Sequence, residues 1–199
     1  MRVVETGPTG TLSDGDLIGR SLANPACFAV IFDRHADEIL RYAHARLGPD
    51  LAEDVVAETF LAAFARRDRY DITRADARPW LYGIAIRQIG RHRRAGARRL
   101  RLLRSLPSEP PAEDLDGRAA ERVTAQAMRP RLAEVLAGLS RDDRELLLLV
   151  AWAGLSYAES AEAMGVTVSA VKSRLNRIRT RTRKALGGTD PMAAEEETT

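Results

Sequence analysis

The chain has 199 residues, of which 45% are hydrophobic and 30% charged, so it can bury a core and is not disordered by composition. Aromatic residues make up only 5%, whereas alanine, leucine and arginine are frequent, which favours helices over a sheet sandwich. The single cysteine, Cys27, excludes a disulfide framework and a cysteine-based zinc site, and no apolar run is long enough to predict a membrane span. Since no apolar signal core follows a basic start, we expect a reduced, cytoplasmic setting.

Composition divides the chain into two helical domains. Few apolar anchors and several turn formers predict a flexible arm over residues 1–12, before a first helical domain over residues 13–106. Three prolines, at positions 107, 110 and 111, lie among acidic side chains at the start of residues 107–124, which we interpret as an extended acidic linker. A second domain is expected over residues 125–187, and residues 188–199 are expected to be a disordered acidic tail. The predicted fold class is therefore all-α, with two small helical domains joined by a flexible linker.

Capping signals and apolar spacing predict the helices of the first domain. Ser13, with Asp16 three residues later, has the pattern of a capping box and predicts the start of a first helix. Apolar residues at three- and four-residue steps predict three more helices, over residues 26–47, over residues 50–66, and from Pro79 towards Arg104. A polar loop over residues 67–78 precedes the last of these helices.

The second domain contains the pattern of a helix-turn-helix. Pro130 can open one helix and Ser140 can cap the next, and Ser156 with Glu159 forms a capping box for a short third helix. Gly165 permits a sharp turn, after which Thr167 can cap a last helix. We expect three residues of the short helix and four of the last helix to face the core, namely Ala158, Ala161, Met164, Val168, Val171, Leu175 and Ile178.

The other side of the last helix is polar and cationic, with groups suited to base edges and phosphates in a DNA major groove. Its residues are Ser169, Lys172, Ser173, Asn176, Arg177 and Arg179. The alternative is a small helical bundle with a solvated basic face, but the short helix, glycine turn and basic helix in this order favour DNA binding.

Charge is unevenly placed, although the formal net charge is only +3. No acidic residue occurs from Ala77 to Ser108 or from Ala163 to Thr189, and both stretches are rich in arginine. Two basic blocks in a nearly neutral chain indicate two contacts with a polyanion, although each block alone could be a solvated face. Near the first block, Trp80 lies among arginines and could stack on a nucleobase, or it could be an ordinary core residue.

The helix over residues 50–66 carries an acidic face formed by Glu53, Asp54 and Glu58. It could bind a partner protein or simply be solvated. Acid–base catalysis or a metal site is disfavoured, because no nucleophile, histidine pair or glycine-rich phosphate loop accompanies these carboxylates. We therefore expect neither catalytic activity nor a cofactor or metal.

Three stretches, in this order, resemble the two domains of extracytoplasmic-function RNA polymerase sigma factors. They are "LAEDVVAETFLAAF", "ARPWLYGIAI" followed by "RHRR", and "GLSYAESAEAMGVTVSAVKSRLNRIR". The resemblance covers roughly residues 28–186. It implies a subunit that binds core RNA polymerase and directs promoter-specific transcription initiation, with no membrane span and with an anti-sigma factor as a further candidate partner. A free-standing helix-turn-helix regulator is the alternative.

The resemblance also implies roles for particular residues. Core polymerase would contact Glu53, Asp54 and Glu58. The minus-ten promoter element would be recognised and opened by Arg69, Tyr70, Arg74, Trp80, Arg87, Arg91 and His92. The minus-thirty-five element would contact Ser169, Lys172, Ser173, Arg174 and Arg177. Arg87 and Arg91 depart from residues common in the family, and these added cations should strengthen attraction to phosphate without adding sequence information.

Overall fold

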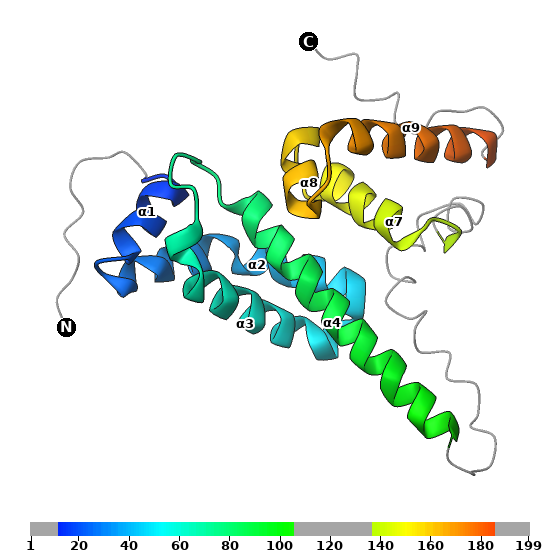
Figure 1. Cartoon of the computed structure of the whole chain (residues 1–199), viewed down its shortest axis with the longest axis horizontal. Helices are drawn as coiled ribbons and strands as arrows, with labels where there is room; N and C mark the ends of the chain where they lie inside the picture. Colours follow the sequence, from blue (N-terminus) through cyan, green and yellow to red (C-terminus); the bar gives the residue numbers. More distant parts are fainter. Residues whose placement is uncertain (1–11, 106–136, 186–199) are drawn as a thin grey trace.

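The computed structural model describes residues 12–105 and 137–185, and every regular element assigned within these two ranges is a helix (Figure 1). The all-α prediction is therefore confirmed for the described part of the chain. The predicted arm, acidic linker, helix opening at Pro130 and acidic tail lie outside it. Among the described helices, none is both long and apolar enough to cross a membrane.

The first helix, α1 (Asp14–Ser21), begins where its capping signal predicts. The Ser13 hydroxyl oxygen accepts a hydrogen bond from the Asp16 amide at 3.1 Å, and the Asp16 carboxylate accepts one from the Ser13 amide at 3.2 Å. The second predicted helix is divided into a 3-10 turn, η1 (Pro25–Phe28), and α2 (Ala29–Leu47). Cys27 lies half-buried in η1.

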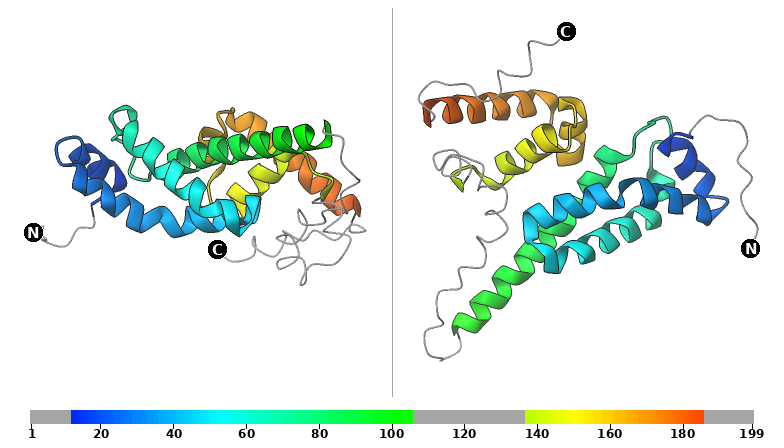
Figure 2. Two further views of the ribbon diagram at one scale, coloured as in Figure 1. Left: turned by 90° about the horizontal axis from the view of Figure 1, so that it is seen from below. Right: turned by 180° about the vertical axis from the view of Figure 1, so that it is seen from behind.

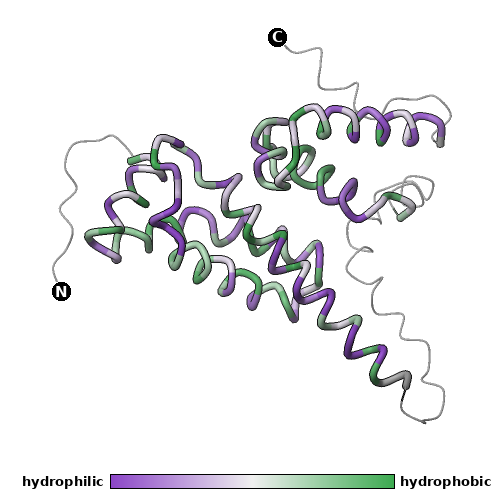
Figure 3. Tube along the Cα trace, in the orientation of Figure 1, coloured by the Kyte–Doolittle hydropathy of each residue, from purple (hydrophilic) through white to green (hydrophobic). Residues whose placement is uncertain are grey.

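Three long helices form the body of the first domain: α2, α3 (Pro49–Ala65) and α4 (Arg78–Ser105). Gly48 joins α2 to α3 with a φ of 82°, a left-handed conformation that suits glycine. A short 3-10 turn, η2 (Arg67–Arg69), follows α3. The end of α4 runs beyond the other helices (Figure 2) and is mostly hydrophilic (Figure 3).

Four elements form the described part of the second domain. They are α7 (Arg141–Leu147), a π-helical turn η4 (Leu148–Trp152), α8 (Tyr157–Met164) and α9 (Val168–Ala185). Ser140 caps α7 as predicted, because its hydroxyl oxygen accepts a hydrogen bond from the Asp143 amide at 3.1 Å. The domain has a small apolar core of its own, made by Leu139, Leu146, Ala161, Val171, Leu175 and Ile178.

The second domain packs directly on the first. Leu149, Ala153 and Leu155 join the apolar core formed by α1 to α4, and α8 lies against α4 (Figure 1). The close approach depends on Gly83, where an added Cβ would lie only 3.0 Å from the carbonyl oxygen of Ala163. The sequence predicted two domains separated by a linker and did not predict this contact.

Candidate nucleic-acid interface

Local hydrogen bonds build the helix-turn-helix in the predicted way. The Glu159 carboxylate accepts a hydrogen bond from the Ser156 amide at 2.7 Å, and the Ser156 hydroxyl accepts one from the Glu159 amide at 3.2 Å. Gly165 follows α8 with a φ of 65°, and the Thr167 hydroxyl accepts a hydrogen bond from the Ala170 amide at 3.2 Å at the start of α9. These contacts fix the turn and the direction in which α9 leaves it.

Two of the predicted core residues in this motif are exposed. Ala158 faces solvent, because α8 packs through Ala161 on its own domain and through Ala163 on α4. Val168 is 39% exposed, since it lies in the first turn of α9 before the helix reaches its neighbours. The predictions that these two side chains face the core are therefore wrong, whereas Val171 is buried as predicted.

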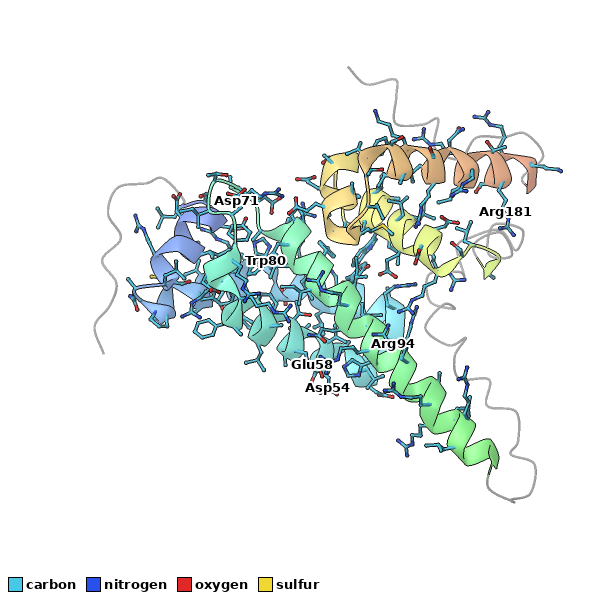
Figure 4. The ribbon with its side chains drawn as sticks, in the orientation of Figure 1. Asp54, Glu58, Asp71, Trp80, Arg94 and Arg181 are labelled. Atoms are coloured by element: carbon cyan, nitrogen blue, oxygen red, sulfur yellow. The ribbon has the colours of Figure 1, made fainter. Side chains whose placement is uncertain are left out.

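The outer face of α9 is exposed and carries polar and cationic groups. The exposed residues are Ser169, Lys172, Ser173, Asn176, Arg177 and Arg179. Arg174 differs from them, because it is half-buried and its Nη1 lies 3.3 Å from Oδ2 of Asp142 on α7. The cations continue along the helix to Arg181 (Figure 4). An exposed helix of this composition, beginning at a tight turn, has the form of a major-groove recognition helix.

The predicted aromatic pair of the first domain lies where η2 connects to α4. The rings of Tyr70 and Trp80 are 4.9 Å apart and tilted by 51°. Tyr70 is buried, and its hydroxyl lies 3.1 Å from the carbonyl oxygens of both Arg74 and Asp76. Burial raises the pKa of Tyr70 to about 12. Tyr70 therefore supports the connecting loop from inside, while the half-buried Trp80 retains part of its surface.

The four arginines predicted for the minus-ten site are all exposed. Arg69, Arg87 and Arg91 are exposed, and Arg91 also donates a hydrogen bond to the side chain of Gln88 at 2.9 Å. Arg74 is exposed too, but it pairs with Asp71 at 3.4 Å and with Glu162 of α8. The second domain thus contacts one cation that was predicted to bind DNA.

The acidic face of α3 is only partly a free surface. Glu53 and Asp54 are exposed, whereas Glu58 is half-buried and its Oε2 lies 3.2 Å from Nε2 of His92 on α4 (Figure 4 labels Asp54 and Glu58). The sequence identified no cation on α3 near these carboxylates, and the partner of Glu58 comes instead from α4. Glu58 and His92 were predicted to bind different partners, and the structure brings them together.

A buried ionic contact between the domains was not identified from the sequence. Glu145 of α7 pairs with Arg46 and accepts a hydrogen bond from the Tyr42 hydroxyl, and burial raises the pKa of Tyr42 well above its ordinary value. Arg78 reaches the carbonyl oxygen of Ala153 in the same interface. The sequence offered one signal for the burial of Glu145, which is that it directly precedes an apolar run. Glu145 lies with Leu146 on the buried side of α7.

No group of three or more metal-ligating side chains is placed to hold an ion within residues 12–105 and 137–185. The chemistry that these surfaces offer is cationic, hydrogen-bonding and stacking, which are the contacts that proteins make with nucleic acid. The two candidate surfaces, on α9 and around Trp80, lie on different domains.

Family models identify both domains. Residues 31–99 match Sigma-70 region 2, and residues 129–182 match Sigma-70, region 4. The fold and the two family matches therefore define a sigma factor of the sigma-70 class, which is a transcription initiation factor.

Similar proteins narrow the class to one group. The chain is 32% identical over 160 residues to ECF RNA polymerase sigma factor SigL of Mycobacterium tuberculosis, covering 79% of this chain and 88% of SigL. It is 30% identical over 154 residues to RNA polymerase sigma factor NccH of Alcaligenes xylosoxydans xylosoxydans, covering 76% of this chain and 82% of NccH. The solved structure of CnrH in complex with the cytosolic domain of CnrY matches with a TM-score of 0.60 and 26% identity, over 87% of this chain and 97% of CnrH. The chain belongs to the extracytoplasmic-function (ECF) RNA polymerase sigma factors.

Proposed function

We propose that the two domains divide promoter recognition between them, with α9 binding the minus-thirty-five element as duplex DNA and the surface around Trp80 binding the minus-ten element as it opens. The observation that carries this proposal is the exposed polar face of α9, which begins at the glycine turn and presents its first residues outward. Recognition helices of helix-turn-helix proteins contact base edges mainly through their N-terminal residues. Ser169, Lys172 and Ser173 occupy that part of α9, and Arg177 follows one turn later.

The minus-ten site would combine a stacking surface with cations. The half-buried ring of Trp80 offers a face for an unstacked base, and Arg69, Arg87 and Arg91 are exposed nearby in the chain for contacts with phosphate. Stacking of a base on an aromatic side chain contributes about 1–3 kcal/mol, which is enough to offset a share of the cost of unstacking it. Tyr70 would act indirectly, by supporting the loop beneath Trp80.

Core RNA polymerase would bind the exposed side of α3. Asp54 is exposed there, and Leu61, which is 69% exposed, lies two helical turns further along the same face. An exposed large apolar side chain beside carboxylates suits a protein partner with cations around an apolar contact better than it suits water alone. Glu53 would add to the same acidic surface, and Glu58 would do so only after leaving His92.

We further propose that the chain has no catalytic activity of its own and acts in the cytoplasm, where a sigma factor meets the polymerase and chromosomal DNA. An anti-sigma factor is proposed as a third partner, on the basis that CnrH was solved in complex with the cytosolic domain of CnrY. A free-standing helix-turn-helix regulator is the alternative function.

Reconstituted transcription tests the proposal. The purified full chain is mixed with core RNA polymerase and a promoter library randomised across both elements, and the transcripts are sequenced. We expect the chain to co-purify with core polymerase and to select two separated sequence elements. A chain that binds duplex DNA tightly by itself, never associates with the polymerase and selects a single element would instead be a free-standing regulator.

A further inference from the structure

The loop that joins η2 to α4, residues 70–77, is bound at its far end by an aspartate of α1, Asp14. We call it the 70–77 loop. The Asp14 amide donates a hydrogen bond to the carbonyl oxygen of Ala75 at 3.0 Å, and Oδ2 of Asp14 accepts one from the Ala77 amide at 3.0 Å. Asp14 therefore holds both sides of Asp76 while the loop surface from Asp71 to Ala75 stays exposed.

The backbone of α1 also presses directly on this loop. A Cβ added to Gly15 would lie 2.4 Å from the carbonyl oxygen of Ile72 and 2.5 Å from that of Arg74. Real Cβ atoms do not approach backbone oxygens so closely, so any side chain here must displace the loop. By contrast, a Cβ at Gly19 would meet only the Ile72 side chain at 3.6 Å, an ordinary contact.

Asp14 is itself fixed by a buried network centred on His35. The Nε2 atom of His35 lies 2.7 Å from Oδ2 of Asp14, and its Nδ1 lies 2.9 Å from Oε1 of Glu38. Arg34 donates to Oδ1 of Asp14 at 2.9 Å, and Arg78 donates to Oε2 of Glu38 at 3.2 Å. The network thus joins α1 and α2 to the first residue of α4, which is where the 70–77 loop ends.

Charge strengthens the hydrogen bonds of this network. Although burial alone would lower the pKa of His35, its hydrogen bonds to Asp14 and Glu38 raise it to about 9, so the imidazole carries a proton at neutral pH and donates from both nitrogens. Hydrogen bonds between charged groups are about twice as strong as those between neutral groups. Asp14 is 5% exposed and His35 is 8% exposed, so water competes little for these contacts.

The geometry points to Asp14 and His35 as positioning residues that hold the 70–77 loop in the conformation required to recognise the minus-ten strand. They do not contact DNA themselves, since both are buried. They act through the loop backbone, which carries Arg74 and leads into Trp80. The inference rests on the proposed function of that surface.

A supporting shell of this kind matters because binding groups must be held within a fraction of an ångström of their productive geometry. A loop with five exposed residues in a row, Asp71 to Ala75, has little apolar burial to keep it in one conformation. Loss of the Asp14 contacts should therefore change which bases the loop accepts and slow promoter opening, without changing the α9 surface on the other domain.

The test compares variants in holoenzyme on promoters selected by the wild-type chain from the randomised library. Asp14→Ala removes the grip on the loop, Asp14→Asn keeps an acceptor for the Ala77 amide but removes the charge, and Gly15→Ala displaces the loop directly. Two rates are measured, on fully paired templates and on templates already unpaired at the minus-ten element, together with the base preference at each position.

We expect Asp14→Ala to slow opening of paired templates by about tenfold or more, the scale of losing one hydrogen bond to a buried charge. Gly15→Ala should slow opening as well, because it displaces the loop. Base preference at the minus-ten element should flatten, while core affinity and minus-thirty-five preference stay within about twofold of wild type. Asp14→Asn should give an opening rate and a base preference between those of Asp14→Ala and the wild type. The matched control, Gly19→Ala on the same helix, should behave as wild type.

The outcomes separate the inference from the proposed function. A wild-type chain that selects no minus-ten sequence would overturn the proposed function itself. If the wild type selects one and Asp14→Ala and Gly15→Ala keep its full minus-ten preference, the positioning role is wrong. Equal losses at both promoter elements would also overturn it, since they would indicate general destabilisation. Thermal unfolding of each variant shows whether it folds. If Asp14→Ala does not fold, the minus-ten preference of Gly15→Ala tests the positioning role.

Discussion

Glu145 of the helix-turn-helix domain forms a buried ion pair with Arg46 of the first domain, and the two side chains are only 5% and 2% exposed. Tyr42 donates to the same carboxylate, and its ring lies 6.4 Å from that of Trp152. Two charged groups removed from water are strongly coupled, because either one alone would be left uncompensated. The contact therefore ties the packing of the second domain on α2 and α4 to one carboxylate.

Replacing Glu145 should separate the domains. In Glu145→Ala, Arg46 stays buried without its partner, a situation that costs roughly 3–5 kcal/mol. Because undocking lets Arg46 return to water, we expect the domains to part before either unfolds. Small-angle scattering of the full chain should show a larger radius of gyration, with helix content by circular dichroism unchanged.

Two further variants check this interpretation. Replacing both partners with apolar residues, Arg46→Met with Glu145→Leu, should restore the compact form, since apolar replacements of buried ion pairs are often neutral or stabilising. Gly83→Ala should part the domains by a different route, through contact with the Ala163 carbonyl oxygen, whereas Gly96→Ala has open space around it and should not. A compact Glu145→Ala protein would show that the remaining apolar and polar contacts hold the interface without this ion pair.

His35 should make the stability of the first domain depend on pH. Its pKa is about 9 in the folded chain against an ordinary 6.5, because the hydrogen bonds to Asp14 and Glu38 outweigh the lowering effect of burial. The folded state therefore holds a proton that the unfolded state releases between these values. The resulting stabilisation is complete below pH 6.5 and is lost as the pH rises through about 9. Its maximum is about 3 kcal/mol.

Urea unfolding at pH 6.5 and pH 9 measures this effect. The wild-type free energy of unfolding should fall more between the two values than that of His35→Gln, which cannot take up the proton. Identical pH profiles for wild type and His35→Gln would contradict the charged network.

Asp14 should contribute to stability at acidic pH. Burial alone would raise its pKa, but its hydrogen bonds to His35 and the Ala77 amide lower the pKa to about 2. The stabilisation from Asp14 is therefore present above pH 3.8 and is lost as the pH falls towards 2.

Features that depend on neighbours within a few residues could be predicted from the sequence. The caps at Ser13 and Ser156 and the left-handed turn at Gly165 are of this kind, because each depends on hydrogen bonds within one helical turn. The outward face of α9 was also predictable, since three buried residues at helical spacing leave the other side free.

Contacts between distant segments could not be predicted in this way. Glu145 and Arg46 are 99 residues apart, and nothing near either residue indicates the other. The same limit explains why Ala158 was wrongly predicted to face the core, since apolar periodicity does not show that α8 turns one side to α4. It also explains why the contact of Glu58 was missed, since the charge on α3 does not show that His92 of α4 faces Glu58. The contacts of Asp14 and His35 could not be predicted either, because they depend on how α1 packs against the 70–77 loop.

Charge reversal on α3 should test the polymerase surface. Asp54→Arg is expected to weaken binding to core polymerase by at least about tenfold, because a like charge placed against a cationic partner is repelled. Fluorescence anisotropy of the labelled chain titrated with core enzyme measures the affinity. Asp37→Arg on α2 makes the same exchange at another exposed site and should change the affinity little. Unchanged binding by Asp54→Arg would remove α3 from the interface.

The start of α9 should carry sequence readout at the minus-thirty-five element. Lys172 is exposed in its second turn, where a recognition helix meets base edges, whereas Arg181 is exposed near the far end of the helix. Lys172→Ala should cost about 1–3 kcal/mol on the preferred sequence and relax the preference at one base pair. Arg181→Ala should at most weaken binding to all sequences alike. It should also reduce the slope of log affinity against log salt concentration by about one.

Holoenzyme binding to minus-thirty-five duplexes, each with one substituted base pair, distinguishes these effects at several salt concentrations. A loss for Lys172→Ala that is equal on every duplex would assign Lys172 to phosphate instead of a base. A position-specific loss for Arg181→Ala would move the readout towards the end of α9. Either result would change how α9 lies on DNA, because one straight helix cannot present both its first turns and its last turns to the floor of the same groove.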